Sequence, residues 1–361
     1  MKTLFTGDIV PTAGNAELFA AGDAAAIFND ALPLFAGNDV NCVNLECALT
    51  ESDLPIRKIG PALKAPRGTA ATLAKIGVTH CALSNNHIFD YGKRGARDTL
   101  AALAAAGIAA TGFGKDLADA EKNLVIEKNG ERLCVIAVCE HEYSFALEDR
   151  MGARPFDPFR TPLAVRAAKR DCDRVVVLYH GGKEQCRYPS PRLREACRAM
   201  AESGADLILC QHSHCVGCYE QVNGCHILFG QGNFCFVTDD DLEGWNDGFA
   251  VRYDTATHEI GFIPVVSDRK RGIKLANGAE KEAILAAFAA RNDALANGGW
   301  REGWHAFCES KRASYTRAAA RACVEEYGET AVEKFAHYLY CEAHTDVWRE
   351  LFPIYNFTNE K

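Results

Sequence analysis

The chain has 361 residues, of which 48% are hydrophobic and 24% are charged, which is the composition of an ordinary globular protein. Its formal net charge is −8 at pH 7 and it has no run of clustered lysines and arginines, so nucleic acid is not expected as a partner. It contains no stretch of about 18 apolar residues, so no membrane span is expected either.

The first 240 residues alternate short apolar runs with segments of helical spacing. The runs that predict strands are residues 3–6, 40–45, 78–83, 175–179 and 207–210. The segments that predict helices include residues 67–76, 97–106 and 191–203. Gly77, Gly107 and Gly204 follow these three segments, and a left-handed helix cap favours glycine. Strands that alternate with helices are typical of layered α/β proteins.

Three pairs of apolar runs predict antiparallel strands instead. Asn129-Gly130 and Asn223-Gly224 each separate two such runs, and Asn-Gly in this position is the strongest short hairpin signal. Residues 249–253 and 260–266 form a third expected pair. We therefore expect two mixed sheets, or one highly twisted sheet, with helices outside, in a domain that covers residues 1–270.

From about residue 277 the strand signal disappears. Residues 280–296, 310–327 and 331–344 are predicted to be helical, and Gly298-Gly299 separates the first two segments. We interpret residues 277–361 as a helical C-terminal appendage. Its aromatic residues are expected to pack in a core rather than to form a ligand cage. They are Trp300, Trp304, Tyr327, Phe335, Tyr338, Tyr340 and Trp348.

Sixteen cysteines are scattered along the chain. Several of them, such as Cys81 and Cys139, lie inside apolar runs, and the N-terminal segment lacks the long apolar core of a secretion signal. We therefore expect reduced thiols, most of them in the core, and a cytoplasmic location. Cys215 and Cys218 have the spacing of half a zinc knuckle, but the neighbouring cysteines are poorly spaced to supply the other half.

Polar side chains stand at the same end of five predicted strands. The carboxyl ends of parallel strands meet at one edge of a sheet, where ligands bind in α/β proteins, so we expect these side chains to converge. They are Asp8, Asn44 and Glu46, Asn86 and His87, His180, and His212 with His214.

This mixture of residue types is suited to divalent metal ions. Carboxylates, amide oxygens and neutral imidazoles fit Zn, Mn or Fe better than Mg or Ca, and the set is large enough for two ions. Each residue also has a structural alternative, because Asp8 could cap a turn, Asn86 could hold a turn and His180 could be a core histidine. Their joint arrival at equivalent strand ends favours the metal site.

Six motifs occur in order along residues 1–240: GD, NLE, SNNHIFDYG, HGGKE, QHSH and GQGNFCF. Together they resemble the CapA-like family of poly-γ-glutamate capsule synthesis, a branch of the calcineurin-like metallophosphoesterase superfamily. The resemblance implies a metallophosphatase-like α/β sandwich with mixed sheets flanked by helices, and a metal-dependent hydrolase with a dinuclear site.

The metal ligands that this resemblance implies follow the strand ends. They are Asp8 and His214 for the first ion, Glu46 as the bridging ligand, and Asn86, His180 and His212 for the second ion. Two positions depart from the superfamily pattern, because Val10 replaces the histidine of an Asp-x-His motif and Glu46 replaces a bridging aspartate. The first site could therefore be weaker, or be completed by Asn44 or water.

The resemblance also implies catalytic and substrate-binding roles. His87 would be the general acid that protonates the leaving group after a metal-bound hydroxide attacks. Asp90 could orient His87, although capping a turn would explain it equally well. The candidate substrate contacts are Asn44, Glu184 and Asn233. Glu184 and the adjacent Lys183 could instead be merely exposed to solvent.

Two functions of different classes fit this sequence. The first is a divalent-metal-dependent hydrolase, most simply a phosphoesterase, that acts on a small-molecule or oligomeric anionic substrate; a γ-glutamyl amide is an alternative by analogy. The second is a non-catalytic binding or assembly component of polymer synthesis, which the incomplete first motif favours and the lack of a membrane anchor disfavours. The appendage could cover the site as a lid. No particular oligomeric state is predicted.

Overall fold

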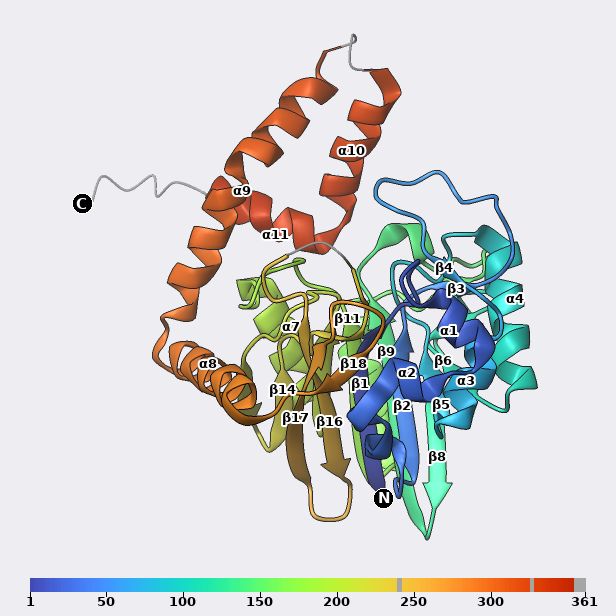
Figure 1. Cartoon of the computed structure of the whole chain (residues 1–361). Helices are drawn as coiled ribbons and strands as arrows, with labels where there is room; N and C mark the ends of the chain where they lie inside the picture. Colours follow the sequence, from blue (N-terminus) through green and yellow to red (C-terminus); the bar gives the residue numbers. More distant parts are fainter. Residues whose placement is uncertain (239–241, 325–327, 354–361) are drawn as a thin grey trace.

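The computed structural model describes residues 1–238, 242–324 and 328–353. Within these residues, two β-sheets pack against each other and helices cover their outer surfaces (Figure 1). The expected α/β sandwich with mixed sheets is therefore confirmed, and the alternative of a single highly twisted sheet is wrong.

The first sheet has the strand order β18-β17-β16-β1-β2-β5-β6, and β15 also pairs with β1. The pairings among β1, β2, β5, β6 and β15 are parallel, whereas β16, β17 and β18 join the sheet by antiparallel pairings. The bounds are β1 Lys2–Ile9, β2 Val40–Leu45, β5 His80–Ala82, β6 Ala109–Thr111, β15 Asn233–Cys235, β16 Asp247–Asp254, β17 Glu259–Ser267 and β18 Ile273–Leu275.

The second sheet has the order β13-β14-β12-β11-β9-β8, with β9, β11, β12 and β14 parallel. Both Asn-Gly hairpins are confirmed, because Asn129, Gly130, Asn223 and Gly224 all have positive φ, the conformation that such turns require. The bounds are β8 Leu124–Lys128, β9 Glu131–Cys139, β11 Arg174–His180, β12 Leu207–Gln211, β13 Tyr219–Val222 and β14 Cys225–Leu228. Two short pairs are β3 Ala48–Leu49 with β4 Lys64–Ala65, and β7 Phe113–Gly114 with β10 Gly152–Ala153.

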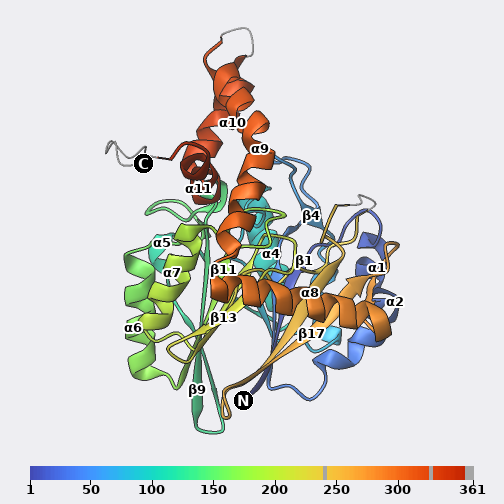
Figure 2. The same ribbon diagram turned by 90° about the vertical axis from the view of Figure 1, so that its left-hand side faces the viewer.

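Helices flank the two sheets on opposite sides (Figure 2). The three helices predicted before residue 204 are all present, as α3, α4 and α7. In α7, Pro191 occupies the first turn and the Ser190 side chain accepts a 3.0 Å hydrogen bond from the Leu193 backbone N–H, as a stable N-cap does. The bounds are α1 Ala16–Ala21, α2 Ala24–Phe28, η1 Asn29–Phe35, α3 Thr69–Lys75, α4 Gly92–Ala105, α5 Leu117–Ala120, η2 Glu142–Ser144, α6 Arg160–Asp171 and α7 Pro191–Glu202.

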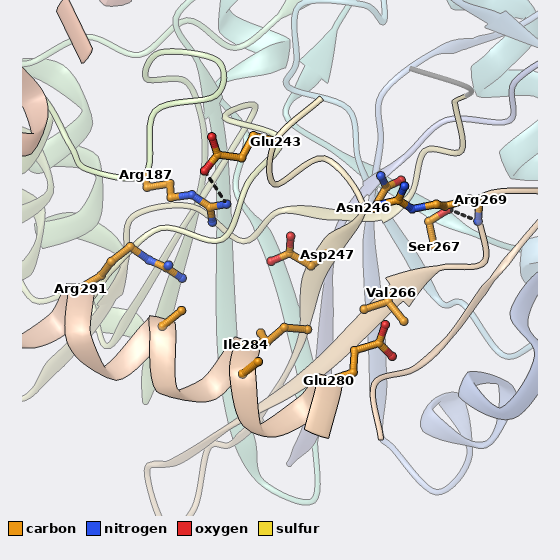
Figure 3. Close-up of a pocket in the computed structure, with 12 residues that line it drawn as sticks. Arg187, Glu243, Asn246, Asp247, Val266, Ser267, Arg269, Glu280, Ile284 and Arg291 are labelled. Atoms are coloured by element: carbon orange, nitrogen blue, oxygen red, sulfur yellow. Dashed lines mark hydrogen bonds and ion pairs between the residues drawn. The ribbon is translucent and has the colours of Figure 1, made fainter. Parts of the chain in front are cut away.

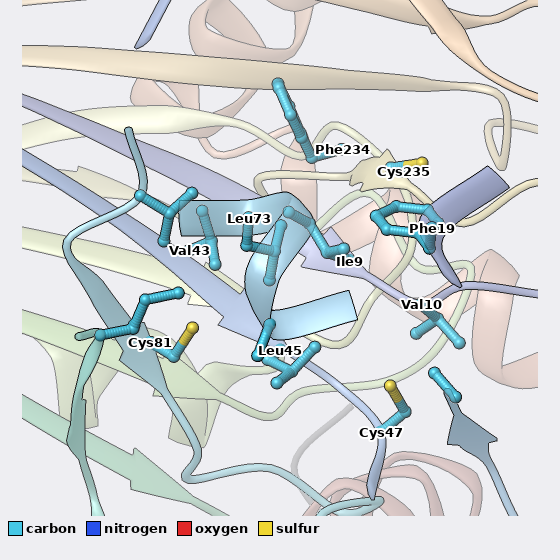
Figure 4. Packing of buried hydrophobic residues seen from close by; sticks show 14 of the residues in the cluster. Ile9, Val10, Phe19, Val43, Leu45, Cys47, Leu73, Cys81, Phe234 and Cys235 are labelled. Atoms are coloured by element: carbon cyan, nitrogen blue, oxygen red, sulfur yellow. The ribbon is translucent and has the colours of Figure 1, made fainter. Parts of the chain in front are cut away.

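Three clusters of buried apolar side chains form the core. The central cluster fills the space between the sheets, with Phe5 from the first sheet and Leu209 from the second. The cluster under the first sheet joins it to α1–α4 and includes Val10 (Figure 4). The third cluster packs α6 and α7 onto the second sheet and continues through Trp300 and Trp304 into the C-terminal helices. Those helices therefore share a core with the second sheet.

The C-terminal segment is helical, as expected. Its bounds are α8 Gly278–Asn297, α9 Trp300–Ala322, α10 Gly328–Tyr340 and α11 Glu342–Leu351. The single helix predicted over residues 331–344 is wrong, because Cys341 has extended backbone angles and separates α10 from α11. The helix predicted over residues 310–327 begins earlier, at Trp300, and Tyr327 lies outside the described residues. The domain boundary at residues 270–277 stays a prediction.

Most of the aromatic side chains that the sequence places in a core of the appendage are buried or half-buried. Trp300 and Trp304 are each 2% exposed, whereas Tyr340 is 73% exposed on the outer face of α10 and does not pack in a core. All sixteen cysteines are free, and all except Cys323 are buried. Within the described ranges, no helix combines the length and the apolar character that crossing a membrane requires.

Candidate metal centre

The five strand ends that the sequence singles out are divided between the two sheets. β1, β2 and β5 belong to the first sheet, and β11 and β12 to the second. Strand direction gathers the polar side chains within each sheet, and the packing of one sheet on the other then brings the two sets together. For example, His180 Nδ1 from the second sheet lies 3.9 Å from Asp8 Oδ1 of the first.

Asp8, Asn44 and Glu46 form the part of the site contributed by β1 and β2. All three are buried, with exposures of 1% or less. Asn44 donates a 2.6 Å hydrogen bond to Asp8 Oδ1, and the His212 backbone N–H donates a 3.2 Å hydrogen bond to Asp8 Oδ2. These contacts fix the Asp8 carboxylate between the two sheets.

Asn85 organises the loop after β5. Its side-chain oxygen accepts hydrogen bonds from the backbone N–H groups of His87 and Ile88, and its amide donates to the Leu45 carbonyl at 2.9 Å. Asn85 thus ties this loop to the end of β2. The next residue, Asn86, is left facing His180, whose Nε2 lies 2.7 Å from Asn86 Oδ1.

The three predicted histidine ligands gather around Glu46. His180 Nε2 is 3.3 Å from Glu46 Oε1, and the rings of His180 and His212 are 4.9 Å apart between centroids. His214 Nδ1 lies 3.4 Å from Asp8 Oδ2. His212 and His214 both have positive φ, a conformation that is uncommon for residues other than glycine. The chain after β12 is therefore bent so that both imidazoles face the same space.

Potential ligand atoms in this space form three overlapping groups, in each of which the atoms lie within 4.8 Å of one another. The groups are Asp8, Glu46 and His214; Glu46, His180 and His212; and Glu184, His212 and His214. Glu46 belongs to the first two groups, so its carboxylate lies between two sets of candidate ligands.

Buried atoms without partners support the fit to metal ions. Among the described residues, neither carboxylate oxygen of Glu46 has a hydrogen-bond partner, and Nδ1 of His212 has none either. Leaving a buried polar group unpaired is costly, and it is most costly for a carboxylate. A divalent cation would satisfy these atoms, and the nitrogen and oxygen donors suit Zn, Mn or Fe.

Two buried carboxylates and the neighbouring histidines determine the electrostatics of the site. Burial by itself would lower the pKa of His214, but the nearby Glu46 and Asp8 carboxylates raise it to about 10. Burial would raise the pKa of Asp8, yet contacts with His214 and His180 hold it below its usual value. Burial and the neighbouring His141 lower the pKa of His212 well below its usual value, which keeps it in the neutral form that binds metals.

His87, Asp90 and Lys58 form a separate buried group beside the cluster. Asp90 Oδ2 lies 2.6 Å from His87 Nδ1 and accepts a 2.7 Å hydrogen bond from the Leu63 backbone N–H. Asp90 Oδ1 forms an ion pair with Lys58, whose pKa burial lowers although Asp90 opposes that effect. This arrangement fixes the His87 ring and leaves its Nε2 as the nitrogen that can exchange a proton.

The remaining predicted residues have different surroundings. Asn233 Oδ1 lies 2.9 Å from His214 Nδ1 and therefore orients that ring. Glu184 is half exposed at the rim, 3.8 Å from His212 Nε2. Val10 is 2% exposed in the core cluster under the first sheet, so no imidazole stands at the third position of the first motif (Figure 4).

Sequence reasoning missed three buried residues of this region: Lys58, Asn85 and His141. His141 follows β9, which is parallel to β11, but in the sequence the Asn129-Gly130 turn marks this strand only as a hairpin arm. The His141 ring lies 4.2 Å from that of His212, and its Nδ1 is buried without a partner among the described residues. Lys58 lies in a loop, and no sequence signal connects it with Asp90.

A separate cavity of about 540 Å³ lies between α8 and the ends of β16 and β17. It is lined by Arg187, Asp247 and Arg291 among others, and Glu243 forms a 3.7 Å ion pair with Arg187 across it (Figure 3). None of the site residues predicted from the sequence lines it, so it is not part of the candidate metal centre.

The fold and the carboxylate–histidine cluster define an α/β protein with a candidate metal centre at the carboxyl ends of its strands. The family model described as bacterial capsule synthesis protein PGA_cap matches residues 2–238, and the chain belongs to this family. The family resemblance stated from the six motifs is therefore confirmed. The matched region contains all the predicted metal ligands, whereas α8–α11 lie beyond it.

Two proteins named for capsule or PGA synthesis are similar to this chain. The PGA biosynthesis protein CapA of Bacillus subtilis (strain 168) is 30% identical over 277 residues, which cover 73% of this chain and 70% of that protein. The capsule biosynthesis protein CapA of Bacillus anthracis is 29% identical over 214 residues, 56% of this chain and 51% of that protein, so the match spans about half the length of this relative. Among solved structures, the 5'-nucleotidase precursor from Thermus thermophilus aligns with a TM-score of 0.42 and 14% identity, over 80% of this chain and 58% of that one.

Proposed function

We propose that the protein is a divalent-metal-dependent hydrolase, most simply a phosphoesterase, that acts on an anionic substrate connected with capsule polymer synthesis. The observation that carries this proposal is Glu46, a buried carboxylate with no hydrogen-bond partner among the described residues, placed between two groups of candidate ligands. In this proposal Asp8, Glu46 and His214 would hold one ion, and Glu46, Asn86, His180 and His212 would hold another.

In this proposal the metal ions and the residues of the chain have different chemical roles. Divalent ions bound at such a cluster supply Lewis acidity, which activates water and polarises the bond to be broken. His87 is the general acid in this proposal, because Asp90 holds Nδ1 and leaves Nε2 free to give a proton to the leaving group. Lys58 balances the buried charge of Asp90 and so keeps the pair in place.

Hydrolysis of an aryl phosphate such as p-nitrophenyl phosphate, with Mn²⁺ added, tests this proposal. We expect turnover by the full chain and a decrease of about 100- to 10,000-fold in kcat for His87→Ala, the range by which general acids contribute. His305→Ala is the matched control, because His305 is 57% exposed on α9 and is expected to have no effect. A γ-glutamyl anilide assayed in parallel distinguishes an amide substrate from a phosphoester.

A second candidate function is a non-catalytic binding component of polymer synthesis. Val10 favours it, because the buried apolar side chain leaves the first ion with one imidazole fewer than the superfamily pattern provides. Under this alternative, the folded chain binds metal and anionic polymer but hydrolyses neither the phosphoester nor the amide. Metal binding without turnover of either substrate would therefore replace the first proposal with this one.

A further inference from the structure

A cavity of about 300 Å³ adjoins the candidate metal centre on the side of the C-terminal helices. Three parts of the chain line it: the loop between β3 and β4, the strand ends of the candidate centre, and the helices α10 and α11. Its lining includes Lys58, His141, Lys183, Glu184, Lys334 and His337. The helical segment thus contributes directly to the surroundings of the site.

Specific contacts hold α10 and α11 over this cavity. On α11, Asp346 is 5% exposed and accepts hydrogen bonds from Ser190 at 2.5 Å and from Arg192 at 2.9 and 3.0 Å. On α10, His337 Nδ1 lies 2.7 Å from Glu142 Oε1. Arg57 joins the same helix to the β3–β4 loop through ion pairs with Glu329 and Glu333, and Figure 1 shows that loop beside α10. These contacts therefore fix α10 and α11 beside the cavity.

The cavity carries more positive than negative charge. Three lysines line it, against one carboxylate, Glu184. Lys58 is paired with Asp90, but neither Lys183 nor Lys334 has a carboxylate within ion-pair distance in the described part of the chain. Lys334 Nζ lies 6.0 Å from the centre of the Tyr338 ring instead. Ammonium groups without a carboxylate partner around a cavity attract oxyanions.

His141 supplies an independent sign of a ligand in this cavity. It is 5% exposed and lines the cavity, and its Nδ1 is a buried polar atom without a partner among the described residues. The centroid of its ring lies 4.2 Å from that of His212 and 6.4 Å from that of His337 on α10. His141 is therefore close to both the candidate metal centre and the C-terminal helices. Buried polar atoms of this kind are normally satisfied, so an unpaired nitrogen on a residue that lines the cavity is a candidate contact for a ligand group.

We propose that the cavity binds a second anionic group of the substrate, with Lys183 and Lys334 as its charged contacts and His141 as a hydrogen-bond partner. This inference rests on the proposed function, because the first anionic group would lie at the metal centre. The substrate then carries at least two oxyanion groups, carboxylate or phosphate. A volume of about 300 Å³ is at the small end of ligand pockets, so the cavity accommodates one short unit, and a longer chain would extend out of it.

Isothermal titration of the full chain with tetra-γ-glutamate and, separately, with pyrophosphate tests this inference by binding rather than by activity. We expect Lys334→Glu to weaken binding of at least one probe by about tenfold or more, as the loss of a charge-assisted contact should. Lys281→Glu is the matched control: it makes the same charge change on the exposed face of α8, outside the cavity, and should alter the dissociation constant by less than about twofold.

The two probes distinguish the sources of the anionic group. Lys334-dependent binding of tetra-γ-glutamate alone identifies carboxylates, and of pyrophosphate alone identifies phosphates. Failure of the wild-type chain to bind either probe, or equal binding by Lys334→Glu, would overturn the inference. Absence of aryl phosphate turnover by a chain that binds a probe in a Lys334-dependent manner would instead count against the proposed catalytic function alone.

Discussion

The attachment of the C-terminal helices to the α/β body can be tested by removing one arginine. Arg192 on α7 pairs with two buried carboxylates, Glu140 after β9 and Asp346 on α11. Glu140 also accepts hydrogen bonds from the Tyr179 hydroxyl and, at 2.6 Å, from the Gly182 backbone N–H. Arg192→Met would fill similar space but remove the counter-charge of Glu140, and it would leave Asp346 with the exposed Arg349, 4.0 Å away, as its cationic partner.

The expected loss of stability is large because both carboxylates are buried. Glu140 has no exposed side-chain surface and Asp346 has 4%. Removing one partner of such a pair costs about 3–5 kcal/mol. With an unfolding entropy of about 2.1 cal/mol/K per residue, a chain of 361 residues should lose about 4–7 °C in Tm.

Arg57→Ala is the matched comparison, because Arg57 also joins the helices to the body but is 67% exposed. Exposed ion pairs contribute about 0.2–1 kcal/mol each, so its two pairs should account for less than about 3 °C, and 1 M salt should remove most of that difference. Scanning calorimetry of both variants at low and high salt measures the contrast. Equal shifts for the two variants, or a salt-sensitive shift for Arg192→Met, would refute the reasoning.

Two further outcomes concern single carboxylates. Burial and the nearby Glu140 raise the pKa of Glu342 from 4.5 to about 7. The folded state therefore favours the protonated form of Glu342. The wild-type chain should lose up to about 3 kcal/mol of stability as pH rises from about 4.5 to about 7. Glu342→Gln should flatten this decline in Tm measured from pH 5 to 8, and an unchanged slope would contradict the assignment. Asp90→Asn should lower kcat on an aryl phosphate by about 100-fold or more, because Asp90 contacts His87. It should not change the metal content, because Asp90 contacts none of the candidate ligands. An Asp90→Asn variant with the kcat of the wild-type chain would show that His87 needs no such partner.

The sequence predicted most of the fold because local signals agreed with the tertiary structure. Strands such as β2 and β11 are apolar runs buried on both faces, and the two Asn-Gly turns have the backbone conformation that only a few residues adopt easily. The break between α10 and α11 at Cys341 has no glycine or proline to signal it. It follows from the packing of α11 against α9, which only the tertiary structure reveals.

The candidate ligands were predictable for a similar reason. Each lies at or just after the carboxyl end of a parallel strand, so strand direction gathers them at the edges of the two sheets. Lys58 and the residues of α10 were not predictable, because they reach the cavity from a loop and from helices far away in the sequence. Their approach depends on contacts such as Arg192 with Asp346 and Arg57 with Glu333. No periodicity or motif encodes those pairings.

The central claim is that the cluster around Glu46 holds divalent cations, and metal content per chain tests it most directly. Inductively coupled plasma mass spectrometry, after equilibration with Mn²⁺ or Zn²⁺ and removal of free ions, should find two ions per wild-type chain. Glu51→Gln, a control at an exposed carboxylate, should also retain two, whereas Glu46→Gln should retain at most one. A folded wild-type chain with no bound ion, or Glu46→Gln with undiminished metal content, would contradict the account.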